Sequence, residues 1–130
     1  MNKEGYIKYW IKTSASDWNA VKQLYNGRSY LQSLFFAHLA IEKLCKAVWI
    51  RDNQNNHPPR IHNLHILLKS SKLQLSEDQM TFVILMNDFQ LEGRYPDYAE
   101  TIYKRCNSKY TRKILDQANS LRLWLLKNLR

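Results

Sequence analysis

Residues 29–51 read SYLQSLFFAHLAIEKLCKAVWIR, and their apolar side chains would cover nearly the whole circumference of a helix. A helix that is apolar on all sides is buried inside a protein and is not found on its surface. We therefore predict a central helix that starts near Ser29 and ends near Arg51. Its polar exceptions are informative for the same reason, and they are His38, Glu42, Lys43 and Lys46.

Apolar residues recur at helical spacing on both sides of this segment. Asn26-Gly27 is typical of a helix end, and Ser76 followed by Gln79 is typical of a capping box that opens a helix. The predicted helices cover, in order, residues 5–25, 29–51, 63–69, 76–88, 98–105 and 110–129. The short links between the main helices predict an all-α, antiparallel up-and-down bundle of four to five helices.

Length and composition agree with a single domain over residues 1–130. The chain is 45% hydrophobic and 12% aromatic, which is far from the composition of a disordered protein. Three glycines and three prolines provide little material for the many tight turns of a β-sandwich. We expect one hydrophobic core, built from helices.

The sequence gives no sign of export, a membrane span or a metal centre. The longest apolar run, residues 82–86, is far too short to cross a bilayer, and the first residues lack a hydrophobic signal region. Cys45 and Cys106 are too few for a disulfide framework or a zinc site, and His57, His62 and His65 have no carboxylate at ligand spacing. We expect a cytoplasmic protein without cofactor, metal or membrane contact.

A net charge of +9 and an isoelectric point near 9.7 favour a polyanionic partner such as nucleic acid, a nucleotide or an acidic protein. The alternative is a generally basic surface. Within the central helix, Glu42 and Lys46 are four residues apart and His38 lies one turn earlier. These residues and Lys43 form a solvated stripe, a polar seam between helices, or the wall of a nucleotide pocket.

Two further patterns are candidates for chemistry. Arg94-Tyr95-Pro96 could clamp a phosphate and stack on a base, or it could be a rigid turn. Arg51 at the end of the central helix and His57 in the following loop suit RNA cleavage without a metal. Histidine transfers protons near neutral pH, and arginine stabilises the charged phosphorane.

Several of these pieces together resemble the HEPN domain family. Ala37–Ala47, with Glu42-Lys43 and Lys46, is similar to the family's most recognisable helix. Asp17, Ala20 and Ser29-Tyr30 precede it in the family's order. Residues 60–64, Arg60-Ile61-His62-Asn63-Leu64, resemble its histidine-led start of the third helix, and residues 94–97 resemble its late arginine-tyrosine-proline turn.

The resemblance implies a bundle that is usually dimeric and often acts beside a separate minimal nucleotidyltransferase in toxin–antitoxin pairs. It implies nucleotide or RNA binding, for which we expect His38, Glu42, Lys43, Lys46, Arg94 and Tyr95 to line the groove. Many members are metal-independent ribonucleases whose arginine and histidine are separated by four to six residues, and Arg51 and His57 have five between them. A non-catalytic interaction module that docks an acidic partner is the other alternative.

Overall fold

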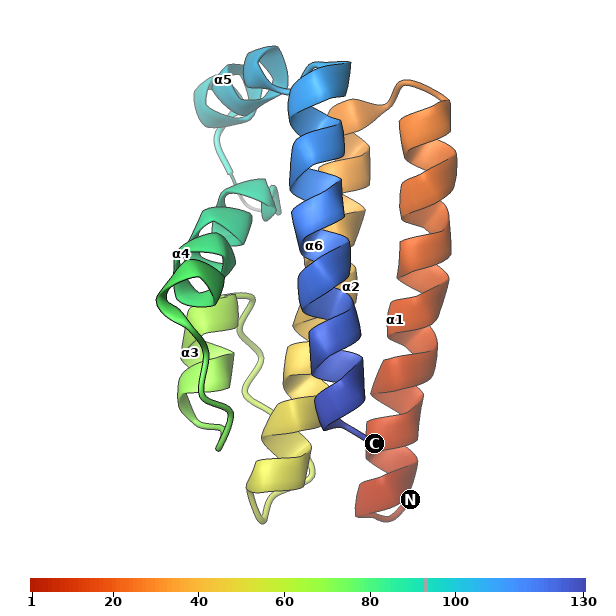
Figure 1. Ribbon diagram of the computed structural model, residues 1–130, viewed down its shortest axis with the longest axis vertical. Coiled ribbons are helices and arrows are strands. Elements are labelled where there is room, and N and C mark those ends of the chain that lie inside the picture. Colours follow the sequence, from red (N-terminus) through yellow and green to blue (C-terminus); the bar gives the residue numbers. More distant parts are fainter. Residues whose placement is uncertain (93) are drawn as a thin grey trace.

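The computed structural model describes residues 1–92 and 94–130 (Figure 1). Its α-helices are α1 (Lys3–Asn26), α2 (Tyr30–Asp52), α3 (Leu64–Lys69), α4 (Glu77–Met86), α5 (Pro96–Arg105) and α6 (Ser108–Asn128), and the short 3-10 helix η1 (Asn87–Phe89) extends α4. The predicted all-α bundle is confirmed. The described residues form six α-helices, which correspond one to one to the six predicted helical segments; the count of four to five helices for the bundle did not include both short ones, α3 and α5.

The long helices α1, α2 and α6 lie side by side, with α3 and α4 along the other flank and α5 at one end (Figure 1). Helix α2 is the central one, since it contacts α1, α3, α6 and η1. Thirteen of its 23 residues are buried. The prediction of a central, buried helix is confirmed, and its cause is the nearly continuous apolar surface of residues 29–51.

Polar side chains fasten α1 along the length of α2. The buried Ser14 hydroxyl of α1 donates a hydrogen bond of 2.6 Å to the carbonyl oxygen of Ala40. At the other end of α2, Lys3 Nζ donates to the carbonyl oxygens of Ile50 and Asn53, each at 2.6 Å. The last carbonyls of a helix have no partner inside the helix, so a lysine there satisfies them and complements the helix dipole.

The local signals place the helix starts closely. Ser76 and Gln79 form the predicted capping box at the start of α4. Helix α5 begins at Pro96, two residues before the predicted start. Proline suits the first helical position because its fixed φ is already helical and no backbone donor is needed there. Among the described residues, no helix combines the length and hydropathy that a bilayer crossing requires.

The turn between α1 and α2 ends α1 where Asn26-Gly27 predicted, but glycine does not take the left-handed conformation. Gly27 has φ −83°, whereas Arg28 has φ 64°. Hydrogen bonds from Arg28 N to Tyr25 O and from Ser29 N to Leu24 O hold the turn. A residue with a Cβ is strained in this region, so Arg28 occupies a position that glycine would fill at lower cost.

Replacing Arg28 with glycine should therefore stabilise the fold. We expect Arg28→Gly to raise the free energy of unfolding by about 1 kcal/mol, because it removes the left-handed strain. Urea denaturation measures this change, with Arg28→Ala as the control that removes the guanidinium and keeps the strain. Equal stabilisation by both variants would show that the charge, and not the backbone, is responsible.

Candidate functional site

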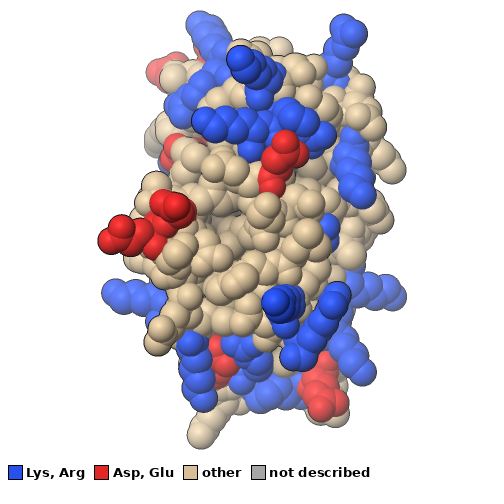
Figure 2. All heavy atoms as spheres, viewed as in Figure 1, with Lys and Arg blue, Asp and Glu red and all other residues tan. Residues whose placement is uncertain are grey.

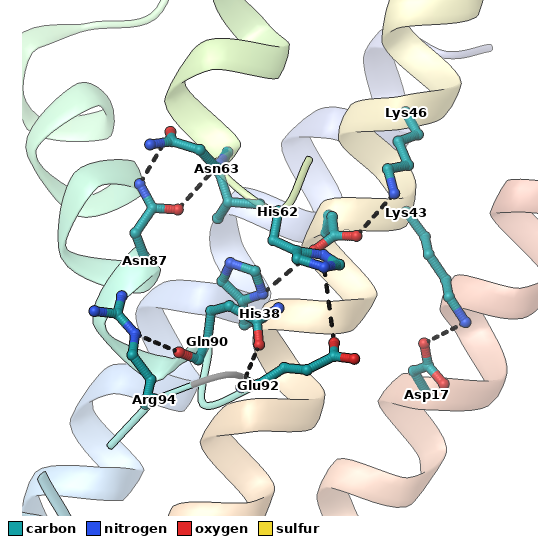
Figure 3. A network of polar contacts seen from close by, with 12 residues as sticks. Asp17, His38, Lys43, Lys46, His62, Asn63, Asn87, Gln90, Glu92 and Arg94 are labelled. Atoms are coloured by element: carbon teal, nitrogen blue, oxygen red, sulfur yellow. Dashed lines mark hydrogen bonds and ion pairs between the residues drawn. The ribbon is translucent and has the colours of Figure 1, made fainter. Parts of the chain in front are cut away.

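A buried carboxylate on α2 organises the polar interior (Figure 3). Glu42 is 4% exposed. Its Oε2 accepts a hydrogen bond of 2.9 Å from Lys46 Nζ, one turn along the same helix. Its Oε1 lies 3.0 Å from His62 Nδ1, which donates in the tautomer that carries the proton on that nitrogen. A buried carboxylate needs such partners, because an unpaired charge is strongly disfavoured away from water.

His38 lies behind this carboxylate and is fully buried. Its Nδ1 is 3.7 Å from Glu42 Oε1, and neither ring nitrogen makes a hydrogen bond to a described residue. Burial lowers the pKa of His38 to about 4, although Glu42 and the nearby Asn87 amide oppose the shift. The Asn87 contact falls short of hydrogen-bond geometry, so we take burial as the dominant cause. His38 is therefore a neutral, internal side chain near neutral pH.

The two lysines on α2 are neutralised by carboxylates. Lys43 Nζ lies 2.7 Å from Asp17 Oδ2 on α1, and the Asp17 side chain is only 15% exposed. Lys46 pairs with Glu42 and also sits over the Trp10 ring, 5.3 Å from its centroid. Of the alternatives for this group of residues, the structure favours a polar seam between helices over a solvated stripe.

A small polar pocket opens beside this seam. It has a volume of about 170 Å³ and is lined by His62, Asn63, Asn87, Gln90 and Arg94. Asn87 Oδ1 accepts from the backbone N–H of Leu64 at 3.0 Å, and Asn87 Nδ2 donates to Asn63 Oδ1 at 3.3 Å. These bonds tie the start of α3 to the end of α4. Two parts of the chain that are distant in sequence, one with His62 and Asn63 and the other with Asn87, Gln90 and Arg94, thereby present donors and acceptors to one pocket.

The residues that follow η1 complete the pocket. Arg94 Nε donates to the carbonyl oxygen of Gln90 at 3.1 Å, and its guanidinium lies 4.5 Å above the Tyr98 ring. Gln90 is 7% exposed, and its Nε2 has no hydrogen-bond partner among the described residues. Tyr95 is 83% exposed and precedes the first residue of α5. Arg94 thus faces the pocket while Tyr95 is free to contact a ligand.

The expected ligand-binding residues therefore fall into two groups. Arg94 lines the pocket and Tyr95 is exposed beside it in the chain, whereas His38 and Glu42 are buried and Lys43 and Lys46 are paired inside the seam. Four pocket residues were not predicted as ligand contacts: His62, Asn63, Asn87 and Gln90. Only Asn63 carries a local signal, since it precedes an apolar run and caps α3 through Ile66 N.

Arg51 and His57 make separate contacts. The Arg51 guanidinium binds both carboxylate oxygens of Asp52, at 2.8 and 3.0 Å, and donates to the carbonyl oxygen of Asn128. This pairing lowers the pKa of Asp52 and raises that of Arg51. His57 packs edge-on against Tyr6, with ring centroids 5.2 Å apart. No hydrogen bond joins Arg51 and His57 in the described ranges, and catalysis by this pair stays a prediction.

No group of three or more histidine, cysteine or acidic residues in the described part of the chain could hold a metal ion. The two cysteines are free and buried. Burial raises the pKa of the Cys106 thiol, and also that of Cys45, so neither is activated as a nucleophile.

Comparison with protein families identifies this bundle. The model of the HEPN domain matches residues 7–129, nearly the whole chain, and the chain belongs to the HEPN domain family. No curated protein and no solved structure matches the sequence. The resemblance noted for residues 37–47, 60–64 and 94–97 is confirmed, and family membership supports a nucleotide- or RNA-related role.

Neutralising Glu42 should destabilise the bundle. We expect Glu42→Gln to lower the free energy of unfolding by about 2 kcal/mol, because two charge-assisted hydrogen bonds are weakened in a buried setting. Glu100→Gln is the control, since the exposed pair of Glu100 and Lys104 contributes well under about 1 kcal/mol. Urea denaturation at pH 7 compares them, and equal losses would contradict a structural role for Glu42.

His38 should make stability depend on pH. Its folded pKa of about 4 lies below the unfolded value of 6.5, so the unfolded chain binds the extra proton between these values. Stability is then fully present above pH 6.5 and falls by about 3 kcal/mol as the pH drops toward 4.

The measurement is urea denaturation from pH 7 to pH 4. His38→Gln should remove this fall in the free energy of unfolding between pH 6.5 and pH 4. His57→Gln, which replaces an exposed histidine, should keep it. An unchanged slope in His38→Gln would show that His38 is not the group responsible.

Proposed function

We propose that the chain is a nucleotide- or RNA-binding module of a two-component, toxin–antitoxin-like system, and that the pocket beside α2 binds the phosphate or the base edge of one nucleotide unit. The observation that carries the proposal is the convergence of five polar side chains, from α2–α3, the end of α4 and the segment before α5, on one pocket. Such a set of amides, an imidazole and a guanidinium offers both donors and acceptors, which phosphates and base edges require.

The roles of the residues follow from their exposure. Arg94 supplies the accessible positive charge. Gln90 also lines the pocket, and its buried Nε2, which has no partner among the described residues, becomes a donor for a ligand when the side chain turns toward the pocket. Tyr95, 83% exposed, offers a ring for stacking on a base. His38, Glu42, Lys43 and Lys46 act indirectly in this proposal, because they hold His62 and the wall of the pocket in place.

Family membership supports the assembly part of the proposal. HEPN domains often act as dimers, and the family resemblance links them to separate minimal nucleotidyltransferases. We expect a homodimer that pairs with such an enzyme. Light scattering measures whether the protein is a dimer. Co-purification with the product of a neighbouring nucleotidyltransferase gene measures whether it pairs with such an enzyme. A monomer that retains no nucleotidyltransferase would contradict the proposed assembly and would leave the proposal about the pocket unaffected.

Removing Arg94 should weaken nucleotide binding. We expect Arg94→Ala to raise the Kd of ribonucleoside monophosphates roughly 10- to 100-fold, since a hydrogen bond to a charged group contributes about 1.5–3 kcal/mol. Titration calorimetry with AMP, GMP, CMP and UMP measures it, and Arg130→Ala, an exposed arginine at the chain end, should behave as wild type.

The outcome against the proposal is equally definite. If folded wild-type protein binds none of the four monophosphates, or if Arg94→Ala and Arg130→Ala bind equally well, the pocket is not a nucleotide site.

A further inference from the structure

The end of the bundle where α1 leads into α2 and α5 leads into α6 concentrates positive charge. Segments 22–32 and 103–116 together contain seven lysines and arginines but only one acidic residue, Asp116, in a chain whose net charge is +9. In the space-filling view, lysines and arginines gather at this end and also at the opposite end of the molecule (Figure 2). We call this surface the basic end, and its cations are Lys22, Arg28, Lys104, Arg105, Lys109, Arg112 and Lys113.

The cations of the basic end are available to a partner. All seven are exposed. Only two approach a carboxylate within the described ranges, Lys104 with Glu100 at 3.4 Å and Arg112 with Asp116 at 3.5 Å, and both pairs are solvent-exposed. Exposed pairs of this kind are weak and easily exchanged. The contrast with Lys43 and Lys46, which are paired inside the seam, is clear.

The basic end is hollowed and carries aromatic rings between its charges. A hollow of about 480 Å³ lies between Arg28 and Tyr30 on one side and Tyr103 and Lys104 on the other. Tyr103 is 61% exposed. A second hollow of about 340 Å³, between α1 and α6, contains Lys22, Tyr25 and Arg112.

Two aromatic contacts lie between these hollows. The ring centroids of Tyr25, which lines one hollow, and Tyr30, which lines the other, are 5.4 Å apart. The Arg112 guanidinium lies 4.4 Å over the Tyr25 ring. Cations and aromatic rings therefore lie next to one another at this end.

This pattern fits one class of partner. Proteins that bind single-stranded nucleic acid combine a positive groove, which neutralises the backbone, with aromatic side chains on which bases stack. An acidic protein segment would use the same charges, and the test below separates these two partners.

We propose that the basic end is a binding surface for single-stranded nucleic acid, distinct from the polar pocket. Lysines and arginines of α5 and α6 contact backbone phosphates, and Tyr103 stacks on a base. The proposal deepens the proposed function by naming a polynucleotide as partner, and it rests on that function only for the expectation that the strand is RNA.

The test compares two charge reversals of equal size at opposite ends of the bundle. The first variant is Lys104→Glu/Arg105→Glu/Lys109→Glu. The control is Lys69→Glu/Lys72→Glu/Lys127→Glu, three exposed lysines at the other end. Lys72 is placed there by the bond from its backbone N–H to Asp52, and Lys127 precedes Asn128, whose carbonyl accepts from Arg51. Fluorescence anisotropy with labelled U₁₂ RNA and dT₁₂ DNA reports binding.

We expect the first variant to lose at least about 50-fold in affinity for U₁₂. The slope of log affinity against log salt concentration should become shallower by the amount that corresponds to roughly two lost phosphate contacts. The control should lose less than about 5-fold. Tyr103→Ala should weaken binding by roughly 5- to 100-fold with an unchanged salt dependence, because stacking is not a charge interaction. Weaker binding of dT₁₂ than of U₁₂ supports RNA as the natural strand, and equal binding supports single strands of either kind.

Three results would overturn the proposal. Equal losses of U₁₂ affinity in the two triple variants would show that binding depends on net charge and not on the basic end. No loss in Tyr103→Ala, together with competition by poly-glutamate as strong as that by U₁₂, would assign the surface to an acidic protein. Failure of wild-type protein to bind U₁₂ at low salt would show that the basic end does not bind single-stranded nucleic acid.

The proposed pocket is tested separately, because Arg94→Ala affects monophosphate binding and the basic-end variant should not. Monophosphate binding without U₁₂ binding contradicts the basic end alone. U₁₂ binding that depends on the basic end, without monophosphate binding, contradicts the pocket alone.

Discussion

The pairing of Glu42 with Lys46 and His62 is the constraint on which the polar part of the structure depends. Glu42 is the only acidic residue that is buried among the described residues, and it lies on the central helix. A buried carboxylate has to be compensated, and one of its partners, His62, belongs to the segment before α3. The contact between Glu42 and His62 therefore fixes the segment before α3 against α2. The amides of Asn63 and Asn87 then connect it to the end of α4 and define the pocket.

Charge has two different roles in this chain. Within the seam, lysines compensate carboxylates and fix neighbouring helices against each other, as the pair of Lys43 on α2 and Asp17 on α1 does. Of the seven exposed cations at the basic end, only Lys104 and Arg112 lie near a carboxylate among the described residues. Compensated charges contribute little to long-range attraction, whereas uncompensated ones attract polyanions and raise association rates. The high isoelectric point of the sequence thus reflects mainly surface charge outside the seam.

The fold could be predicted from the sequence because its signals are local. The apolar circumference of residues 29–51 predicted a buried helix, and Ser76 with Gln79 predicted the start of α4. The pocket could not be predicted in the same way, because its contacts join distant positions. Glu42 and His62 are 20 residues apart, and Asn63 and Asn87 are 24 apart. Nothing in the spacing of Lys43 within α2 indicates that its partner is Asp17 on α1.

The most direct test of the central claim is a nuclear magnetic resonance titration of ¹⁵N-labelled protein with a ribonucleoside monophosphate, observed at the side-chain amides. Our account predicts that the resonances of Asn63, Asn87 and Gln90 shift together and saturate at one concentration, because all three side chains line the pocket. Shifts that are confined to the basic end, or that leave all three amides unchanged at saturation, would contradict a nucleotide site beside α2.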